Sequence, residues 1–309
     1  MTVVRLGSFS AAAAELGYTQ AAVSQHIAAL EGDLKVTLLN RRPVTPTEQG
    51  ARLLEHADPI LLRLDAARAD ITRMVSSPSA TLLLGATPLS ATTTATIPAA
   101  GEAGGTNGAN RVDGVDEAGA QGMTGALATL RQQLPRTHVT VQLGSRSAVA
   151  IGVARGALDI GLVDGLTAPG DSLPPLAPLD GVSVAEAEVV VVLPGGHPLA
   201  SRASVRLMDL VDARWIEAPN VAPPLSDIRR VAGADGFRPA FTYEGTDTLT
   251  LIRLATAGHG LTLLPTSLVA QLRGIVAVQV GAPPLVHRVE RVHGALRAGS
   301  PAAVLAALL

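Results

Sequence analysis

The sequence has 309 residues, enough for about two domains, and its hydrophobic content of 47% allows a buried core in each. It contains no cysteine, which excludes disulfides, thiolate metal sites and a cysteine nucleophile. Its formal net charge of −2 excludes a polycation, so any contact with nucleic acid must be local. We see no signal peptide over residues 1–16 and no run of about 18 apolar residues that predicts a membrane helix. These features predict a cytoplasmic protein.

Residues 1–46 predict two short helices that follow one another closely. Ser10 is expected to cap a helix over 11–16, which Gly17 ends in a left-handed conformation. Thr19 is expected to cap a second helix that runs to about Glu31. An apolar stripe of the second helix should face a core: Val23, Ile27, Leu30 and Leu34. Another face of this helix is small and polar: Gln20, Ala21, Ser24, Gln25 and Ala28. The arrangement is typical of a helix-turn-helix unit, whose second helix enters the major groove of DNA.

The segment 38–47 predicts a short hairpin, or wing, after the second helix. It carries two adjacent arginines, Arg41 and Arg42, which a wing would direct toward phosphates or the minor groove. A solvated loop is an equally good interpretation of these two arginines by themselves.

The stretch from Gly7 to Gly50 resembles the DNA-binding region of the LysR-type transcriptional regulators. The residues that carry the resemblance are Gly7, Ser8, Phe9, Ala12, Ala13, Leu16, Thr19, Gln20, Ser24, Ile27, Leu30, Glu31, Leu38, Leu39, Arg41, Thr47 and Gly50. The resemblance implies a winged helix-turn-helix domain over 1–47. We expect its DNA-binding residues to be Thr19, Gln20, Ala21, Ser24, Gln25, Arg41 and Arg42.

The sequence also departs from the family pattern. The family usually has another helix before Gly7, and only six residues precede this glycine, so we expect the first helix to be missing. Residues 1–46 hold four basic and three acidic side chains, a small excess for a DNA-binding domain because phosphate contacts usually dominate affinity. We therefore expect weak DNA binding that depends on dimerisation.

Residues 48–75 predict one long linker helix, followed by a hinge over 76–80. An apolar series at heptad-like spacing runs along the helix: Leu54, Ala57, Leu61, Leu64, Ile71 and Val75. Such a stripe predicts the seam of a homodimer, and packing on the chain's own second domain is the alternative. The resemblance favours the dimer, because the family pairs through this helix. Pro59 should kink the helix or mark a new start.

Residues 81–309 predict an α/β domain with largely parallel sheets. The expected strands are Thr81–Thr87, His138–Leu143, Ala157–Val163, Glu188–Leu193 and Leu261–Leu264. The segment 101–122 has seven glycines among 22 residues and predicts a flexible insertion. The domain resembles the family's effector domain, a two-lobed fold like a type 2 periplasmic binding protein. The resemblance implies one lobe over about 81–164 and 280–309, and the other over about 165–279.

An effector is expected between the two lobes. The expected effector-binding residues are Thr87, Pro88 and Ser90 from one lobe and Thr246, Asp247 and Thr248 from the other. Hydroxyl groups at the start of a helix suit a small anion, and a helix cap without a ligand is the alternative. The seven histidines show no metal-ligand spacing, and no hydrolase or nucleotide-binding motif is present, so we expect no metal, cofactor or catalytic residues.

The sequence thus predicts a transcription regulator that binds double-stranded DNA as a homodimer or tetramer and responds to a small-molecule effector. The alternative is a two-lobed small-molecule-binding protein or enzyme whose truncated N-terminal region does not bind DNA.

Overall fold

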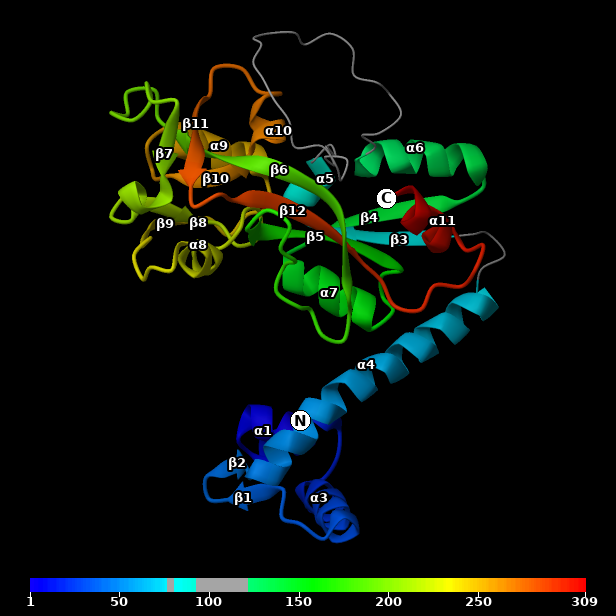
Figure 1. Cartoon of the computed structure of the whole chain (residues 1–309). Helices are drawn as coiled ribbons and strands as arrows, with labels where there is room; N and C mark the ends of the chain where they lie inside the picture. The colour runs from blue at the N-terminus through cyan, green and yellow to red at the C-terminus, as the bar shows by residue number, and fades with distance from the viewer. Residues whose placement is uncertain (77–80, 93–121) are drawn as a thin grey trace. The chain divides into compact units, whose positions relative to one another are not determined.

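The computed structural model describes residues 1–76, 81–92 and 122–309 (Figure 1). The chain divides into two compact units, residues 1–65 and residues 66–309, and each is described by itself. Residues 77–80 of the predicted hinge and 101–121 of the predicted insertion lie outside the described residues.

The 1–65 unit begins with a short helix before Gly7. Helix α1 (Thr2–Leu6) ends at Gly7, which adopts a left-handed conformation with φ of 60°, and buries Val3. A helix of five residues therefore precedes Gly7 and contributes Val3 to the core of this unit.

The helix-turn-helix unit consists of α2 (Phe9–Leu16) and α3 (Gln20–Leu34). Gly17 ends α2 with a φ of 70°, and the Thr19 hydroxyl accepts a hydrogen bond from the Ala22 amide at 3.2 Å, as the sequence predicted. The cap of α2 differs from the prediction. Ser8, not Ser10, accepts the hydrogen bond from the Ala11 amide, because the helix already begins at Phe9.

The apolar stripe of α3 is only partly buried. Val23 lies in the core and Ile27 is half-buried, whereas Leu30 and Leu34 are exposed. The core of this unit is small: Val3, Ala12, Ala13, Val23 and Leu39. It covers the first turns of α3, and the helix continues past it to Leu34, three residues beyond the expected end.

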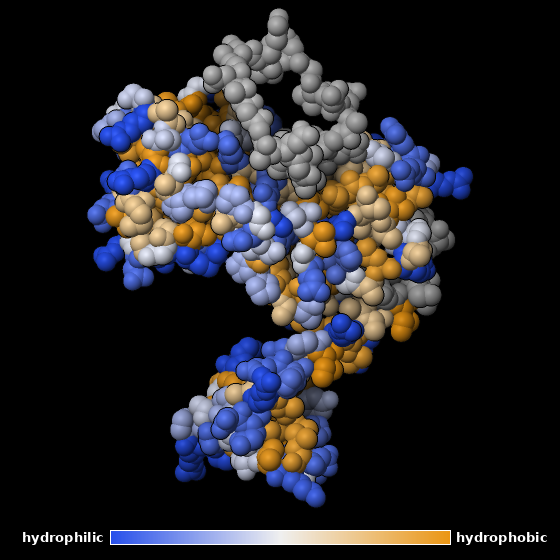
Figure 2. All heavy atoms as spheres, in the orientation of Figure 1, coloured by the Kyte–Doolittle hydropathy of each residue, from blue (hydrophilic) through white to orange (hydrophobic). Residues whose placement is uncertain are grey.

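The predicted wing is present as a two-stranded antiparallel hairpin, β1 (Leu39–Arg41) and β2 (Val44–Pro46). Helix α4 (Glu48–Ser76) follows and continues through Pro59 without a break. Part of its predicted apolar stripe is open to solvent: Leu61, Leu64 and Ile71 are exposed, as is the neighbouring Ile60, whereas Leu54 and Ala57 are half-buried. Figure 2 shows hydrophobic residues on the surface in the part of the picture where Figure 1 draws α4. None of the helices in the described part of the chain is long and apolar enough to cross a membrane.

An eight-stranded mixed sheet organises the 66–309 unit (Figure 1). Its strands are β3 (Thr81–Ala86), β4 (His138–Leu143), β5 (Ile160–Thr167), β6 (Gly181–Leu193), β7 (Ser204–Arg206), β10 (Thr262–Pro265), β11 (Val276–Ala282) and β12 (Val286–Val292). Their order is β4-β3-β5-β12-β6-β11-β7, and β10 also pairs with β6. A second, two-stranded sheet joins β8 (Trp215–Glu217) to β9 (Pro239–Thr242).

The expectation of largely parallel sheets is wrong. Strands β3, β4 and β5 are parallel, but β12 is antiparallel to both β5 and β6, and β10 and β11 are antiparallel to β6. The antiparallel pairs arise because β12 runs between β5 and β6 in the direction opposite to both, and because β10 and β11 run opposite to β6. Strand β6 pairs with β12 up to Glu188 and with β10 from Val189 onward, so it changes partners midway. The lobe boundaries implied by the resemblance, near 164 and 280, fall inside β5 and β11.

Helices cover both faces of the sheet. These are α5 (Pro88–Thr92), α6 (Met123–Gln133), α7 (Arg146–Ala154), α8 (Leu225–Ala232), α9 (Thr248–Thr256), α10 (Thr266–Val269), α11 (Pro301–Leu308) and the 3₁₀ helix η1 (Leu207–Leu210). Helices α6 and α11 pack on one face of β3 and β5, and α7 lies on the other face (Figure 1). A separate core around Trp215 and Phe237 joins the second half of β6 to β11 and α8.

Candidate DNA-binding and effector-binding sites

The N-terminal end of α3 presents the predicted base-reading residues together. Ala21 and Gln25 are exposed, and Ser24 is half-buried beside them. The carbonyl oxygen of the Gln20 side chain accepts a hydrogen bond from the Ser10 hydroxyl at 3.0 Å, which leaves the Gln20 amide nitrogen as a donor. Thr19 uses its hydroxyl to cap the helix. This surface therefore offers hydrogen-bonding groups of the kind that read base edges.

The two wing arginines have different surroundings. Arg41 turns toward α3, where it donates to the Ser24 hydroxyl at 3.3 Å and lies 3.6 Å from a Glu31 carboxylate oxygen. Its guanidinium also lies over the Phe9 ring, 5.1 Å from the centroid. Arg42 is exposed and forms no hydrogen bond or ion pair with any described residue. The sequence treated the two arginines alike, and the structure separates them.

Glu31 is a candidate functional residue that the sequence interpretation missed. One of its carboxylate oxygens accepts hydrogen bonds from the backbone amides of Leu38 and Leu39, at 2.8 and 3.2 Å. The other oxygen faces Arg41. Glu31 thus connects the end of α3 to the first strand of the wing. The signal for it was the Leu30-Glu31 pair in the family resemblance, but the resemblance carried no role for the carboxylate.

The predicted effector residues Thr87, Pro88 and Ser90 lie at the end of β3 and the start of α5, and all three are buried. The Ser90 hydroxyl donates to the backbone carbonyls of Thr87 and Leu162, at 2.9 and 3.1 Å, so its proton already has acceptors. The Thr87 hydroxyl, on a residue that is 4% exposed, has no hydrogen-bond partner among the described residues. The Thr87 hydroxyl therefore differs from that of Ser90 in having no partner within the described part of the chain.

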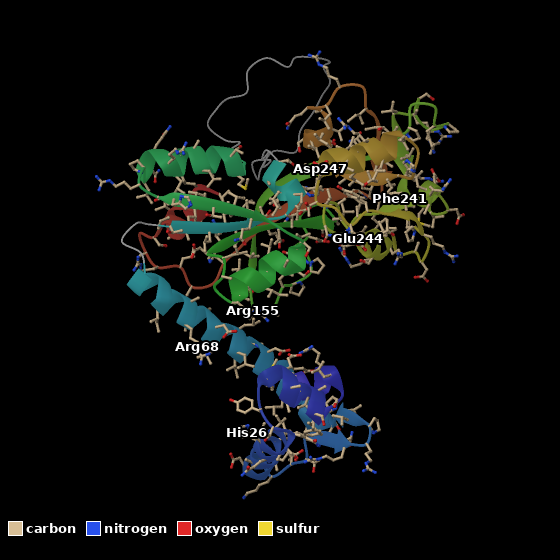
Figure 3. All side chains as sticks on the ribbon, turned by 180° about the vertical axis from the view of Figure 1, so that it is seen from behind. His26, Arg68, Arg155, Phe241, Glu244 and Asp247 are labelled. Carbon is tan, nitrogen blue, oxygen red and sulfur yellow. The ribbon has the colours of Figure 1, made fainter. Side chains whose placement is uncertain are left out.

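Asp247 caps α9 with its own side chain (Figure 3). Its carboxylate accepts hydrogen bonds from the Thr250 amide at 2.8 Å and from the Thr250 hydroxyl at 2.6 Å. These hydrogen bonds stabilise the ionised form and hold the pKa of Asp247 below its usual value. Thr246 is exposed before the cap, and Thr248 begins the helix half-buried. An ionised carboxylate at this position disfavours an anion directly beside it.

One hydrophobic cluster contains sequence neighbours of both groups of predicted effector residues. Leu89, which lies between Pro88 and Ser90, packs in the same cluster as Leu251 and Ile252 of α9. The fold thus connects the start of α5 to the helix that Asp247 caps. These two segments lie about 160 residues apart in the sequence.

A buried polar network near β5 and β12 was not recognised from the sequence. His287 Nε2 lies 2.6 Å from Asp164 Oδ2, and both side chains are buried. Burial lowers the pKa of Arg146, against the opposing charge of Asp227, and burial raises the pKa of Asp227, against the opposing charge of Arg230. In the sequence, His287 was only one of seven histidines without metal-ligand spacing. Its contact with Asp164 could not be predicted, because the two residues are 123 positions apart.

Comparisons with known proteins agree on the family. The family model for the LysR substrate binding domain matches residues 103–307, and the model for bacterial regulatory helix-turn-helix proteins of the lysR family matches residues 1–51. A probable RuBisCO transcriptional regulator of Emiliania huxleyi is 29% identical over 219 residues, which are 70% of this chain and 59% of that protein. The HTH-type transcriptional regulator CysL of Bacillus subtilis is 24% identical over 269 residues, 86% of this chain and 78% of CysL.

A solved structure shows the same fold. Full-length CbnR, in a complex with its target DNA, superposes with a TM-score of 0.52 at 17% sequence identity, and the match covers 99% of this chain and 95% of CbnR. The comparison confirms the predicted fold class, a winged helix-turn-helix domain joined to a two-lobed effector domain. The chain belongs to the LysR family of transcriptional regulators.

Proposed function

We propose that this chain binds specific duplex DNA with the N-terminal end of α3 and with Arg42 of the wing. The observation that carries the proposal is the exposed group formed by Gln20, Ala21 and Gln25 beside Ser24. A glutamine side chain can pair with two atoms of an adenine edge, and a serine hydroxyl can contact several bases. Arg42 supplies a positive charge that no described carboxylate neutralises. This function operates in the cytoplasm, where bacterial DNA lies, and we assign no catalytic step to the chain.

The test replaces Ser24 and Gln25 with alanine and measures retardation of the intergenic duplex beside the chain's own gene, at stated salt. We expect the ratio of specific to non-specific affinity to fall by at least about tenfold, because each lost base contact is worth about 1–3 kcal/mol. The matched control carries Ser201→Ala and Gln132→Ala, which remove the same groups from exposed positions outside α3. Specific retardation that survives the Ser24/Gln25 change would contradict this recognition surface.

We further propose that α4 pairs two copies of the chain. Ile60, Leu61 and Leu64 lie on one side of the helix and are exposed, with Ile60 at 65%. A contiguous apolar stripe on a long helix is stabilised when a second helix covers it. Pairing would also place two recognition helices on two half-sites, which raises the affinity that a domain with few free cations can reach. Two such dimers could also assemble into a tetramer, and the proposal includes both the dimer and the tetramer.

We propose that a small-molecule effector binds where β3 meets α5 and modulates DNA binding. The support for this position is the buried Thr87 hydroxyl, which lacks a partner among the described residues, and the cluster that joins Leu89 to α9. A buried hydroxyl without a hydrogen bond is costly, so a ligand that accepts from it is stabilised. Effector binding would shift an existing equilibrium between conformations of the regulator.

A second candidate function is small-molecule binding without DNA. The observation that favours it is the pairing of cations in the 1–65 unit, where Arg5 contacts Glu15, Arg41 contacts Glu31 and Arg52 contacts Glu55. Paired arginines attract phosphates less than free ones do. A folded dimer that retards no duplex specifically, at low or moderate salt, would favour this second function over the first.

A further inference from the structure

We propose that Arg41 is a positioning residue, which holds Ser24 and the wing in place for DNA, and that it does not itself neutralise a phosphate. The inference rests on the proposed DNA-binding function and goes beyond it, because it separates the roles of two adjacent wing arginines. It also assigns a role to Glu31, which anchors Arg41 to α3.

Arg41 connects three elements of the winged helix-turn-helix domain. Its side chain belongs to β1, and its guanidinium meets Ser24 and Glu31 of α3 and the Phe9 ring at the start of α2. Ser24 and Glu31 are seven residues apart, about two turns, so they lie on the same side of α3. The planar guanidinium can make these contacts together, because it presents nitrogens in one plane and a flat face to the ring.

Glu31 determines the direction that Arg41 takes. Its carboxylate is tied to the wing by the backbone amides of Leu38 and Leu39, and its side chain is only 15% exposed. The acceptor for Arg41 is therefore fixed before DNA arrives. A phosphate would have to compete with this carboxylate for the guanidinium, whereas Arg42 has no carboxylate partner among the residues described.

The contact also determines what Ser24 can do. A serine hydroxyl has one proton to donate and two lone pairs that accept. Because Arg41 donates to the Ser24 oxygen, the hydroxyl proton of Ser24 stays available for an acceptor on the DNA. The geometry assigns Ser24 the role of a donor to a base acceptor in the major groove, such as N7 or O6 of guanine or O4 of thymine. Without Arg41 the hydroxyl can rotate, and this preference is lost.

The experiment first selects a duplex from a random-sequence pool with the full wild-type chain. Binding of the selected duplex and of the unselected pool is then measured as a function of salt for the wild type and for Arg41→Met, Arg41→Lys and Arg42→Ala. Each phosphate contact contributes about 0.9 to the slope of log affinity against log salt concentration. Circular dichroism melting of each variant shows whether it is folded, and Arg41→Lys keeps the positive charge in case Arg41→Met fails to fold.

For a positioning residue we expect both Arg41 variants to keep the wild-type salt slope and to lose about tenfold in the ratio of selected to unselected binding. Lysine does not rescue, because it lacks the planar group that reaches Ser24 and covers the Phe9 ring. Arg42→Ala should show the opposite pattern, with a slope lower by about 0.9 and an unchanged ratio.

The possible results distinguish a failure of the role proposed for Arg41 from a failure of the proposed DNA binding. If Arg41→Met lowers the salt slope and Arg41→Lys restores it, Arg41 contacts a phosphate and the inference is wrong. If both Arg41 variants bind as the wild type does, the residue positions nothing and the inference is equally wrong. If the wild-type chain enriches no sequence at all, the proposed DNA-binding function fails first, independently of how Arg41 behaves.

Discussion

At the scale of single residues, removing the hydroxyl of Thr87 and removing that of Ser90 should change the stability of the chain in opposite directions. Thr87→Val should stabilise the effector-free chain by about 1 kcal/mol, because it removes a buried hydroxyl that has no partner among the described residues. Ser90→Ala should destabilise it by about 1 kcal/mol, because this hydroxyl donates to two carbonyls. Denaturant unfolding followed by the fluorescence of Trp215, the single tryptophan of the sequence, measures both. Equal losses from the two changes would show that Thr87 already has a partner and is not free for an effector.

At the scale of elements, Gly50 sets the approach of α4 to the wing. A Cβ added there would lie 2.0 Å from the carbonyl oxygen of Leu38, the residue before β1, so Gly50→Ala forces this backbone away from α4 and should cost about 1–3 kcal/mol. Gly32 is the matched control, since it lies in α3 with nothing within 4 Å, and Gly32→Ala should gain about 0.5–1 kcal/mol. Amide hydrogen exchange over residues 1–65 of the full chain reports both changes. Unchanged protection in Gly50→Ala would mean that the two elements tolerate separation.

At the scale of the whole molecule, the exposed stripe of α4 predicts the oligomeric state. Leu64→Glu should raise the dissociation constant of the dimer by at least about a hundredfold, because a carboxylate buried in an apolar seam without a partner costs several kcal/mol. Ala51→Glu adds the same charge at an exposed position on another side of the helix and should leave the dimer intact. Sedimentation of the full chain over a concentration series distinguishes them. A Leu64→Glu chain that remains dimeric would place the dimer seam elsewhere.

The sequence by itself determined the features that depend on residues close together in the chain. The cap at Thr19 and the left-handed turn at Gly17 were predicted and are present, because capping and helix termination are decided within three or four residues. Five strands of the large sheet were also located from their apolar runs, with ends within four residues of those observed, except that β6 begins seven residues earlier than predicted. The family resemblance then supplied the fold class, which the comparisons confirm, and a prediction of the DNA-binding surface.

Tertiary structure decided the features that depend on contacts between distant residues. The surroundings of Arg41 differ from those of Arg42 because Arg41 contacts Ser24, which lies 17 residues earlier in the sequence. The same holds for His287 and Asp164, and for the antiparallel strands that make the sheet mixed. The sequence pattern could place each of these residues on an element but could not choose its neighbour. A local pattern determines which face of an element is apolar or polar, and only the path of the chain determines what that face meets.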